Sequence, residues 1–267
     1  MILRRKPALK AWGKGENMRK RIIAGNWKMN MSHIEGSALA SRILEGIKGK
    51  ELPCEVVVIP PFTTLPAVAG VLAGANVDTG AQDLWYEDAG AFTGEISGSM
   101  ISMLGCRYVL VGHSERRHIL GEGSEILSLK LRAALRSDLV PIYCVGEVAE
   151  EREKGIAEDV VEKQIREVLE GLDLKEISRI VIAYEPVWAI GTGKTATPDD
   201  ASGMHAFIRG MIADIFNKET ADKMVILYGG SVKPVNASDL LGSSDIDGAL
   251  VGGAALDAGQ FLGIVFS

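Results

Sequence analysis

The sequence predicts an α/β fold, a single-domain (β/α)8 barrel with parallel strands. Eight short, mostly apolar runs recur along the chain, separated by about 20–45 residues, which is enough for one crossover helix each. Their near-continuous apolar character is typical of strands covered on both faces. No clear change in composition divides the chain, so closure of eight βα units into one barrel is expected. A doubly wound open sheet is the alternative, although it usually has about five to seven strands.

The elements can be assigned in order along the chain. Residues 125–138 and 157–172 place apolar side chains on one helical stripe, and Gly171 can end the second of these helices. Residues 197–216 begin with Thr197 as a helix cap and Pro198 at the first helical position. The stripe of residues 157–172 comprises Val160, Val161, Ile165, Val168 and Leu169. The expected strands are residues 21–27, 54–60, 76–82, 108–114, 140–147, 179–186, 224–231 and 246–253.

Composition and charge make several classes of protein improbable. The 267 residues are 47% hydrophobic and 24% charged, as in ordinary globular domains. The formal net charge of −6 argues against a nucleic-acid partner, and no stretch approaches the about 18 apolar residues of a membrane helix. The three cysteines are widely spaced and form no C-x-x-C pair, so a cytoplasmic location is expected. The four histidines form no H-E-x-x-H motif, and no metal site is expected.

The composition of the first 17 residues indicates an N-terminal extension of the barrel domain. They are basic, they lack the apolar core of a signal peptide, and they lack the serines of a transit sequence, although Arg4, Arg5 and Lys6 keep that second alternative open. Met18 directly precedes the first strand pattern. We therefore expect residues 1–17 to lie outside the fold and residues 18–267 to form the catalytic barrel.

Chemically active side chains follow several of the expected strands. Asn26 and Lys28 follow the first strand, His113 and Glu115 follow the fourth, and Glu185 follows the sixth. Each alone is more often a solvated charge or a structural group. Because the carboxyl ends of barrel strands meet at one rim, their convergence there favours an active site.

Two glycine-rich turns indicate an anion site at the same rim. Gly229–Ser231 follow the seventh strand, and Gly252 and Gly253 follow the eighth. Backbone N–H groups can approach a phosphate closely where no Cβ intervenes. Either turn alone could be a tight turn and nothing more. The segment "GTGKT" (191–195) imitates a P-loop, but the required earlier glycine is replaced by Trp188, so that match is weak.

The segment after Glu185 is expected to be a lid over the bound ligand. Pro186 keeps Glu185 extended at the strand end, and Trp188 and Ile190 are too apolar for an idle surface loop. A loop packed permanently against a neighbour is the alternative. The expected lid comprises Pro186, Val187, Trp188, Ala189, Ile190, Gly191, Thr192, Gly193, Lys194 and Thr195.

Six motifs, in order from about residue 20 to the end, resemble the triosephosphate isomerase family. The resemblance implies the TIM-barrel fold and the interconversion of dihydroxyacetone phosphate and D-glyceraldehyde 3-phosphate in glycolysis and gluconeogenesis, without a metal or organic cofactor. The motifs are "AGNWKMN" (24–30), "GAFTGEIS" (90–97), "VGHSERR" (111–117), "AYEPVWAIGTGK" (183–194), "LYGGSV" (227–232) and "DGALVGGAAL" (247–256).

The resemblance also implies the roles of individual residues. Glu185 would transfer the proton between adjacent carbons, neutral His113 would donate a hydrogen bond to the developing enediolate oxygen, and Lys28 would add positive charge. Glu115 would be a supporting carboxylate behind the site. The implied substrate-binding set is Asn26, Lys28, Gly191, Ser231, Gly252 and Gly253.

The segment 84–97 is long for a barrel loop and carries aromatic residues, which suggests burial against another chain. The resemblance implies a homodimer in which this loop, with Trp85, Tyr86, Phe92 and Thr93, lies beside the neighbour's active site. Packing within the same chain is the alternative. One departure from the family is Asp83, where many relatives carry asparagine; we expect it in the interface loop.

Two rival functions remain open at this point. One is another barrel enzyme acting on a sugar phosphate, such as a synthase or an aldolase, whose lysine would form a Schiff base with the substrate. The other is a non-catalytic binding or scaffold protein that keeps the barrel. The combination of Lys28, His113 and Glu185 argues against the second.

Overall fold

The computed structural model describes residues 19–190 and 196–267. The expected extension of residues 1–17 lies outside the described residues. So do Gly191, Thr192, Gly193, Lys194 and Thr195 of the expected lid.

Eight parallel strands in the described ranges close into a barrel in sequence order, so the open-sheet alternative is wrong. Each observed strand lies within its predicted range. The ladders stop one to a few residues before the predicted ends, since the chain there turns into the rim loops. The strands are β1 (Ile22–Asn26), β2 (Glu55–Ile59), β3 (Val77–Ala81), β4 (Tyr108–Val111), β5 (Val140–Val145), β6 (Val181–Tyr184), β7 (Val225–Tyr228) and β8 (Gly248–Val251).

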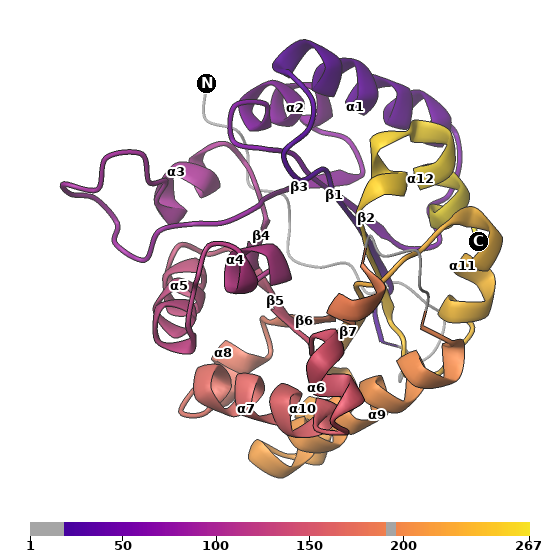
Figure 1. The fold of residues 1–267 in the computed structure, drawn as a ribbon. Helices are drawn as coiled ribbons and strands as arrows, with labels where there is room; N and C mark the ends of the chain where they lie inside the picture. Colours follow the sequence, from indigo (N-terminus) through magenta and orange to yellow (C-terminus); the bar gives the residue numbers. More distant parts are fainter. Residues whose placement is uncertain (1–18, 191–195) are drawn as a thin grey trace.

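The helices surround the barrel as an outer ring (Figure 1). The predicted helices at 125–138, 157–172 and 197–216 are α5, α7 and α9. Helix α7 ends at Leu169, before Gly171, whose φ of +86° suits only the turn that follows. The helices are α1 (His33–Ile47), α2 (Leu65–Leu72), α3 (Gly98–Met103), α4 (Ser114–His118), α5 (Ser124–Arg136), α6 (Ala149–Glu153), α7 (Ala157–Leu169), α8 (Leu174–Ile177), α9 (Pro198–Ile215), α10 (Lys218–Lys223), α11 (Pro234–Leu241) and α12 (Ala258–Val265), with 3-10 turns η1 (Val187–Ala189) and η2 (Gly253–Leu256).

Helix α9 begins as the sequence predicts. Thr197 caps it by accepting a hydrogen bond from the Asp200 N–H at 3.1 Å, and the Asp200 carboxylate accepts in return from the Thr197 N–H at 3.2 Å. None of the helices in the two described ranges combines the length and the apolar character that crossing a membrane requires.

The strands bury both faces, and so two cores form. Along β2, Val56 and Val58 face the helices while Val57 and Ile59 face the barrel axis. This explains why the strand sequences lack the apolar–polar alternation of half-exposed sheets. The interior of the barrel is filled by Ile22, Ala24, Val57, Ile59, Tyr108, Leu110, Ile142, Cys144, Val181, Ala183, Leu227 and Leu250.

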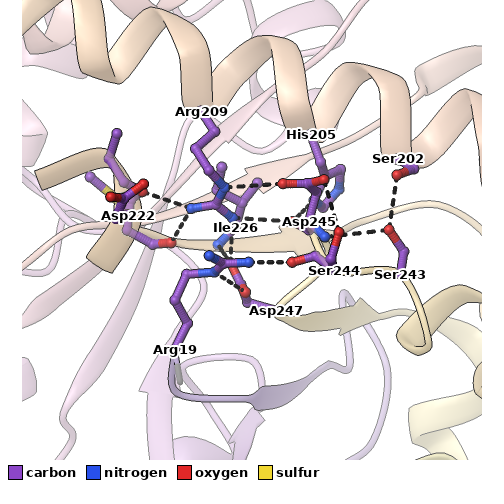
Figure 2. Close-up of polar contacts among 12 residues, drawn as sticks. Arg19, Ser202, His205, Arg209, Asp222, Ile226, Ser243, Ser244, Asp245 and Asp247 are labelled. Atoms are coloured by element: carbon purple, nitrogen blue, oxygen red, sulfur yellow. Dashed lines mark hydrogen bonds and ion pairs between the residues drawn. The ribbon is translucent and has the colours of Figure 1, made fainter. Parts of the chain in front are cut away.

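A buried ionic network supports the barrel where its β7–β8 ladder is shortest. Asp247, directly before β8, accepts hydrogen bonds from Arg209 of α9 at 2.8 Å, from Arg19 at 2.6 Å and from the Ile226 N–H at 2.9 Å. Figure 2 shows the polar contacts around Asp247, with Arg209 above it and Arg19 beside it. The single carboxylate thus joins α9, β7 and the segment that enters β1.

Candidate active site

The strand-end residues predicted from the sequence line one cavity of about 370 Å³ at the carboxyl ends of the strands. Of the predicted catalytic, substrate-binding and supporting residues within the described ranges, only Glu115 does not line it; of the expected lid, Ile190 alone among the described residues does. The lining also includes residues that sequence reasoning did not single out. The cavity is lined by Asn26, Lys28, His113, Glu185, Ile190, Gly229, Gly230, Ser231, Val232, Lys233, Leu250, Gly252, Gly253, Ala254 and Gln260.

Glu185 is a buried carboxylate with defined partners, and its residue is 2% exposed. Its Oε2 accepts a hydrogen bond from the Ser114 N–H at 2.8 Å, and its Oε1 lies 3.0 Å from Nε2 of His113. Gly146, the residue after β5, packs closely against the Glu185 backbone, because a Cβ on Gly146 would lie 1.8 Å from the Glu185 carbonyl oxygen. Only glycine fits at position 146, so this contact places β6 and its terminal carboxylate against β5.

The turn after β4 sets the orientation and the tautomer of His113. Gly112 has a φ of +74°, a conformation that glycine adopts readily, and His113 then caps α4. Nδ1 of His113 accepts a hydrogen bond from the Glu115 N–H at 3.2 Å. Because an accepting nitrogen carries no proton, a neutral ring must carry its proton on Nε2, which faces Glu185.

Lys28 lies on a strained turn that two side chains support. Its φ is +53°, which is uncommon for a residue with a side chain. Asn26 Oδ1 accepts from the Lys28 N–H at 3.0 Å, and Gln82 donates to the Lys28 carbonyl at 2.8 Å. Lys28 Nζ lies 2.6 Å from Glu115 Oε1. Glu115 was expected behind the site; it forms an ion pair directly with Lys28. Gln82 was missed, since no local pattern connects it with a lysine 54 residues away.

The beginning of the expected lid is tied to a second buried carboxylate, Glu147. Its residue is 0% exposed, and it accepts hydrogen bonds from Trp188 Nε1 at 2.8 Å and from the Tyr184 hydroxyl at 3.1 Å. Burial raises the pKa of Glu147, although these hydrogen bonds and Arg152 oppose the rise. Ile190 faces the cavity. The sequence contained a signal for Glu147, because the predicted fifth strand ends in this carboxylate.

The segment 84–97 extends away from the barrel between β3 and α3 (Figure 1). The expectation of exposed aromatic side chains holds only for Phe92, which is 39% exposed. Trp85 and Tyr86 are half-buried within their own chain, and their ring centroids lie 4.4 Å apart. Thr93 is exposed. This segment therefore packs partly against itself at its base and presents its tip to solvent.

The side chain of Asp83, a residue expected in the interface loop, belongs to a buried cluster within its own chain. Asp83 lies two residues after β3, is 5% exposed, and accepts hydrogen bonds from Lys130 Nζ at 2.7 Å with both oxygens. Arg116 Nη2 lies 2.9 Å from Asp83, and Glu122 pairs with both cations. No local pattern indicates this cluster, because the buried partner of Asp83 is 47 residues further along the chain.

Comparisons with known proteins agree with this arrangement. The family model "Triosephosphate isomerase" matches residues 21–267. A triosephosphate isomerase of Rhodopirellula baltica is 51% identical over 247 residues, which are 92% of this chain and 97% of that protein. Those of Roseiflexus castenholzii and Moorella thermoacetica are 53% and 52% identical over 248 residues, which are 93% of this chain and 97% and 98% of those proteins. From the fold, the cavity and these matches we conclude that the chain belongs to the triosephosphate isomerase family.

Proposed function

We propose that this protein is a triose-phosphate isomerase that interconverts dihydroxyacetone phosphate and D-glyceraldehyde 3-phosphate, a step of glycolysis and gluconeogenesis. The observation that carries the proposal is that Lys28, His113 and Glu185 line the same cavity as two glycine-rich turns. An acid–base set at one end and glycine-rich backbone at the other suit a short sugar with a terminal phosphate.

Glu185 is the proposed base. It removes a proton from the carbon next to the carbonyl and returns it to the adjacent carbon, so the overall reaction consumes no proton. Its burial supports this role, since a poorly solvated carboxylate accepts a proton from carbon more readily. In the described state the carboxylate is held by the Ser114 N–H and by His113, and substrate must therefore displace these contacts.

His113 and Lys28 are the proposed stabilisers of the enediolate. The hydrogen bond from Glu115 N–H to Nδ1 supports a neutral ring with a donor at Nε2, directed to the substrate oxygen. Lys28 supplies a positive charge, partly offset by its ion pair with Glu115. Opposite unit charges about 4 Å apart attract by about 4 kcal/mol at an effective dielectric constant of about 20, before desolvation. That local attraction exceeds the influence of the distant net charge, which salt screens.

Phosphate is proposed to bind at the glycine-rich end, to Ser231, Gly252 and Gly253, with Gly191 of the lid. Lys233 also lines this part of the cavity. Asn26 orients the Lys28 backbone and so positions the ammonium group.

The proposed lid, Pro186–Thr195, excludes water while the enediolate exists, which opposes loss of phosphate. Deletion of residues 190–192 is expected to raise methylglyoxal formation, and an unchanged product ratio would count against the lid.

The protein is further proposed to act as a homodimer. Large apolar side chains are exposed on loops after β1, β3 and α4 and on α3, including Met29 at 94%, Met103 at 81% and Ile119 at 77%. In the dimer, the tip of the 84–97 segment lies beside Lys28 and His113 of the neighbour. Sedimentation velocity tests this arrangement, and a fully active monomer contradicts it.

A cytoplasmic location is proposed on the chemistry of the three cysteines. Cys54, Cys106 and Cys144 are all buried and unpaired. Burial raises the pKa of Cys54 to about 12 and that of Cys106 to about 11, so both thiols stay protonated and unreactive. Free thiols of this kind suit a reducing compartment.

The test of the proposed activity is isomerisation of D-glyceraldehyde 3-phosphate by protein freed of metal with a chelator. Glu185→Gln keeps the shape of the side chain but removes the base, and turnover should fall by about 1,000-fold or more, since positioned acid–base groups contribute about 10²–10⁴-fold. Glu219→Gln, at an exposed helix position, is the matched control and should keep full activity. Wild-type turnover in Glu185→Gln would refute the role of the base. Borohydride trapping of a covalent adduct would favour the aldolase alternative.

A further inference from the structure

We propose that Asn236 is a positioning residue that holds the turn after β7 in the shape that binds the substrate phosphate. Asn236 does not line the cavity, and it acts through Ser231 and Lys233, which do. This inference rests on the proposed function, because it assigns a support to the proposed phosphate site.

The turn between β7 and α11 lines the cavity with five consecutive residues, Gly229–Lys233. The Gly229 N–H donates to the Tyr184 carbonyl at 2.7 Å and so anchors the beginning of the turn. Among the described residues, the N–H groups of Gly230, Ser231 and Val232 have no protein acceptor. Three successive backbone donors that line a cavity, and that have no acceptor among the described residues, suit an anion.

Asn236 bridges this turn from the first turn of α11. Its Oδ1 accepts from the Lys233 N–H at 2.7 Å, and its Nδ2 donates to the Ser231 carbonyl at 3.1 Å. A trans peptide directs its C=O and N–H to opposite sides. Because the Ser231 carbonyl is held toward Asn236, the N–H of Val232 in the same peptide faces away from Asn236. The Asn236 side chain therefore determines that the Val232 N–H points to the side of the turn opposite Asn236.

The bridge has two parts that different variants separate. Asn236→Ala removes both hydrogen bonds. Asn236→Asp keeps an acceptor for Lys233 N–H but loses the donor to the Ser231 carbonyl, and it adds a negative charge near the anion. Both are expected to weaken phosphate binding, the second at least as much as the first. Asn217→Ala is the matched control, because Asn217 caps α10 by accepting from the Thr220 N–H at 2.8 Å and lines no part of the cavity.

The experiment measures competitive inhibition by inorganic phosphate, the KM and kcat for D-glyceraldehyde 3-phosphate, and the isomerisation of glyceraldehyde, which carries no phosphate. For Asn236→Ala, the inhibition constant of phosphate and the KM should each rise about tenfold, equivalent to about one hydrogen bond. The kcat/KM for glyceraldehyde should change by less than about twofold, because the acid–base groups are intact. Asn217→Ala should change none of these values.

Two outcomes overturn the inference. Unchanged phosphate inhibition in Asn236→Ala shows that the bridge does not shape the anion site. An equal loss of activity toward glyceraldehyde shows that Asn236 supports the fold in general. If Asn236→Ala does not fold, Asn236→Ser, which is too short to reach both groups, is measured in its place. Failure of the proposed function is distinguishable, since the wild-type protein would then neither isomerise triose phosphate nor bind inorganic phosphate.

Discussion

Replacing Asp83 by asparagine should remove a pH dependence from the stability of this protein. Asp83 is part of a buried cluster of two carboxylates and two cations, with Glu122, Lys130 and Arg116. Burial, together with the neighbouring Glu122 carboxylate, outweighs the cations and raises the pKa of Asp83 from 3.8 to about 6. For Glu122, burial is outweighed by hydrogen bonds from Arg116 and Lys130, and its pKa lies below the usual value.

The sign of the effect follows from the raised pKa. The folded protein binds a proton at Asp83 more tightly than the unfolded chain does, so protonation stabilises the fold. This contribution is fully present below the unfolded pKa of 3.8 and is lost as the pH rises through the folded pKa of about 6. From the difference between the folded and unfolded pKa values, we expect the contribution of Asp83 to the free energy of unfolding of the wild type to be about 1.4 kcal/mol greater at about pH 5 than at about pH 7.5. Glu122 acts in the opposite direction, because its lowered pKa in the folded protein makes its contribution disappear as the pH falls, and the comparison of wild type with variant isolates the contribution of Asp83.

Denaturant unfolding of the wild type and Asp83→Asn at both pH values, at one protein concentration, measures this contribution. The free energy of unfolding of the wild type minus that of the variant should be about 1.4 kcal/mol larger at the lower pH than at the higher pH. Asp88→Asn is the control, because Asp88 is exposed and pairs with Arg136 at 3.1 Å. A difference that stays constant, or that grows toward the higher pH, would refute the reasoning, since the ion pair with Lys130 would then dominate over burial.

Three further variants test the supports of the fold and the site. Thr197→Ala removes the cap of α9 and should lower the free energy of unfolding by about 1 kcal/mol in urea titrations; no change would mean that solvent replaces the cap. Asp247→Asn removes the nearer of the two carboxylates that pair with Arg209, at 2.8 Å, and leaves Asp245 at 3.4 Å. It should lower the free energy of unfolding by about 1.5–3 kcal/mol, measured by thermal unfolding, and an unchanged midpoint would contradict us. Trp188→Phe takes one donor from the buried Glu147 and should cost about 1–3 kcal/mol in guanidinium unfolding, unless water replaces the indole N–H.

Much of the architecture was predictable because its signal is local in the sequence. A strand covered on both faces must be apolar throughout, and β2 and β5 carry that pattern in consecutive residues. The N-terminus of α9 was predictable for the same reason, since its cap, proline and acidic residues are adjacent. The strand-end positions of Lys28, His113 and Glu185 followed from the barrel, whose rim gathers the ends of all its strands.

The partners of these residues were not predictable. The ion pair between Lys28 and Glu115 spans 87 positions, and the hydrogen bond from Ser114 N–H to Glu185 spans 71. Periodic patterns in a sequence relate residues only a few positions apart, so they cannot indicate contacts at such separations. Asp83 is a further example, because the sequence around it did not reveal the buried cluster that its side chain joins through Lys130, 47 positions away.

The sequence by itself determined which residues form strands, which residues stand at their ends, and hence that a base, an imidazole and an ammonium share one rim. Only the tertiary structure decided the tautomer of His113, the buried partners of Glu185 and Asp83, and the bridge of Asn236 across the turn after β7. The physical reason is that burial patterns repeat along neighbouring residues, whereas hydrogen bonds and ion pairs depend on distances of about 3 Å between elements far apart in the chain.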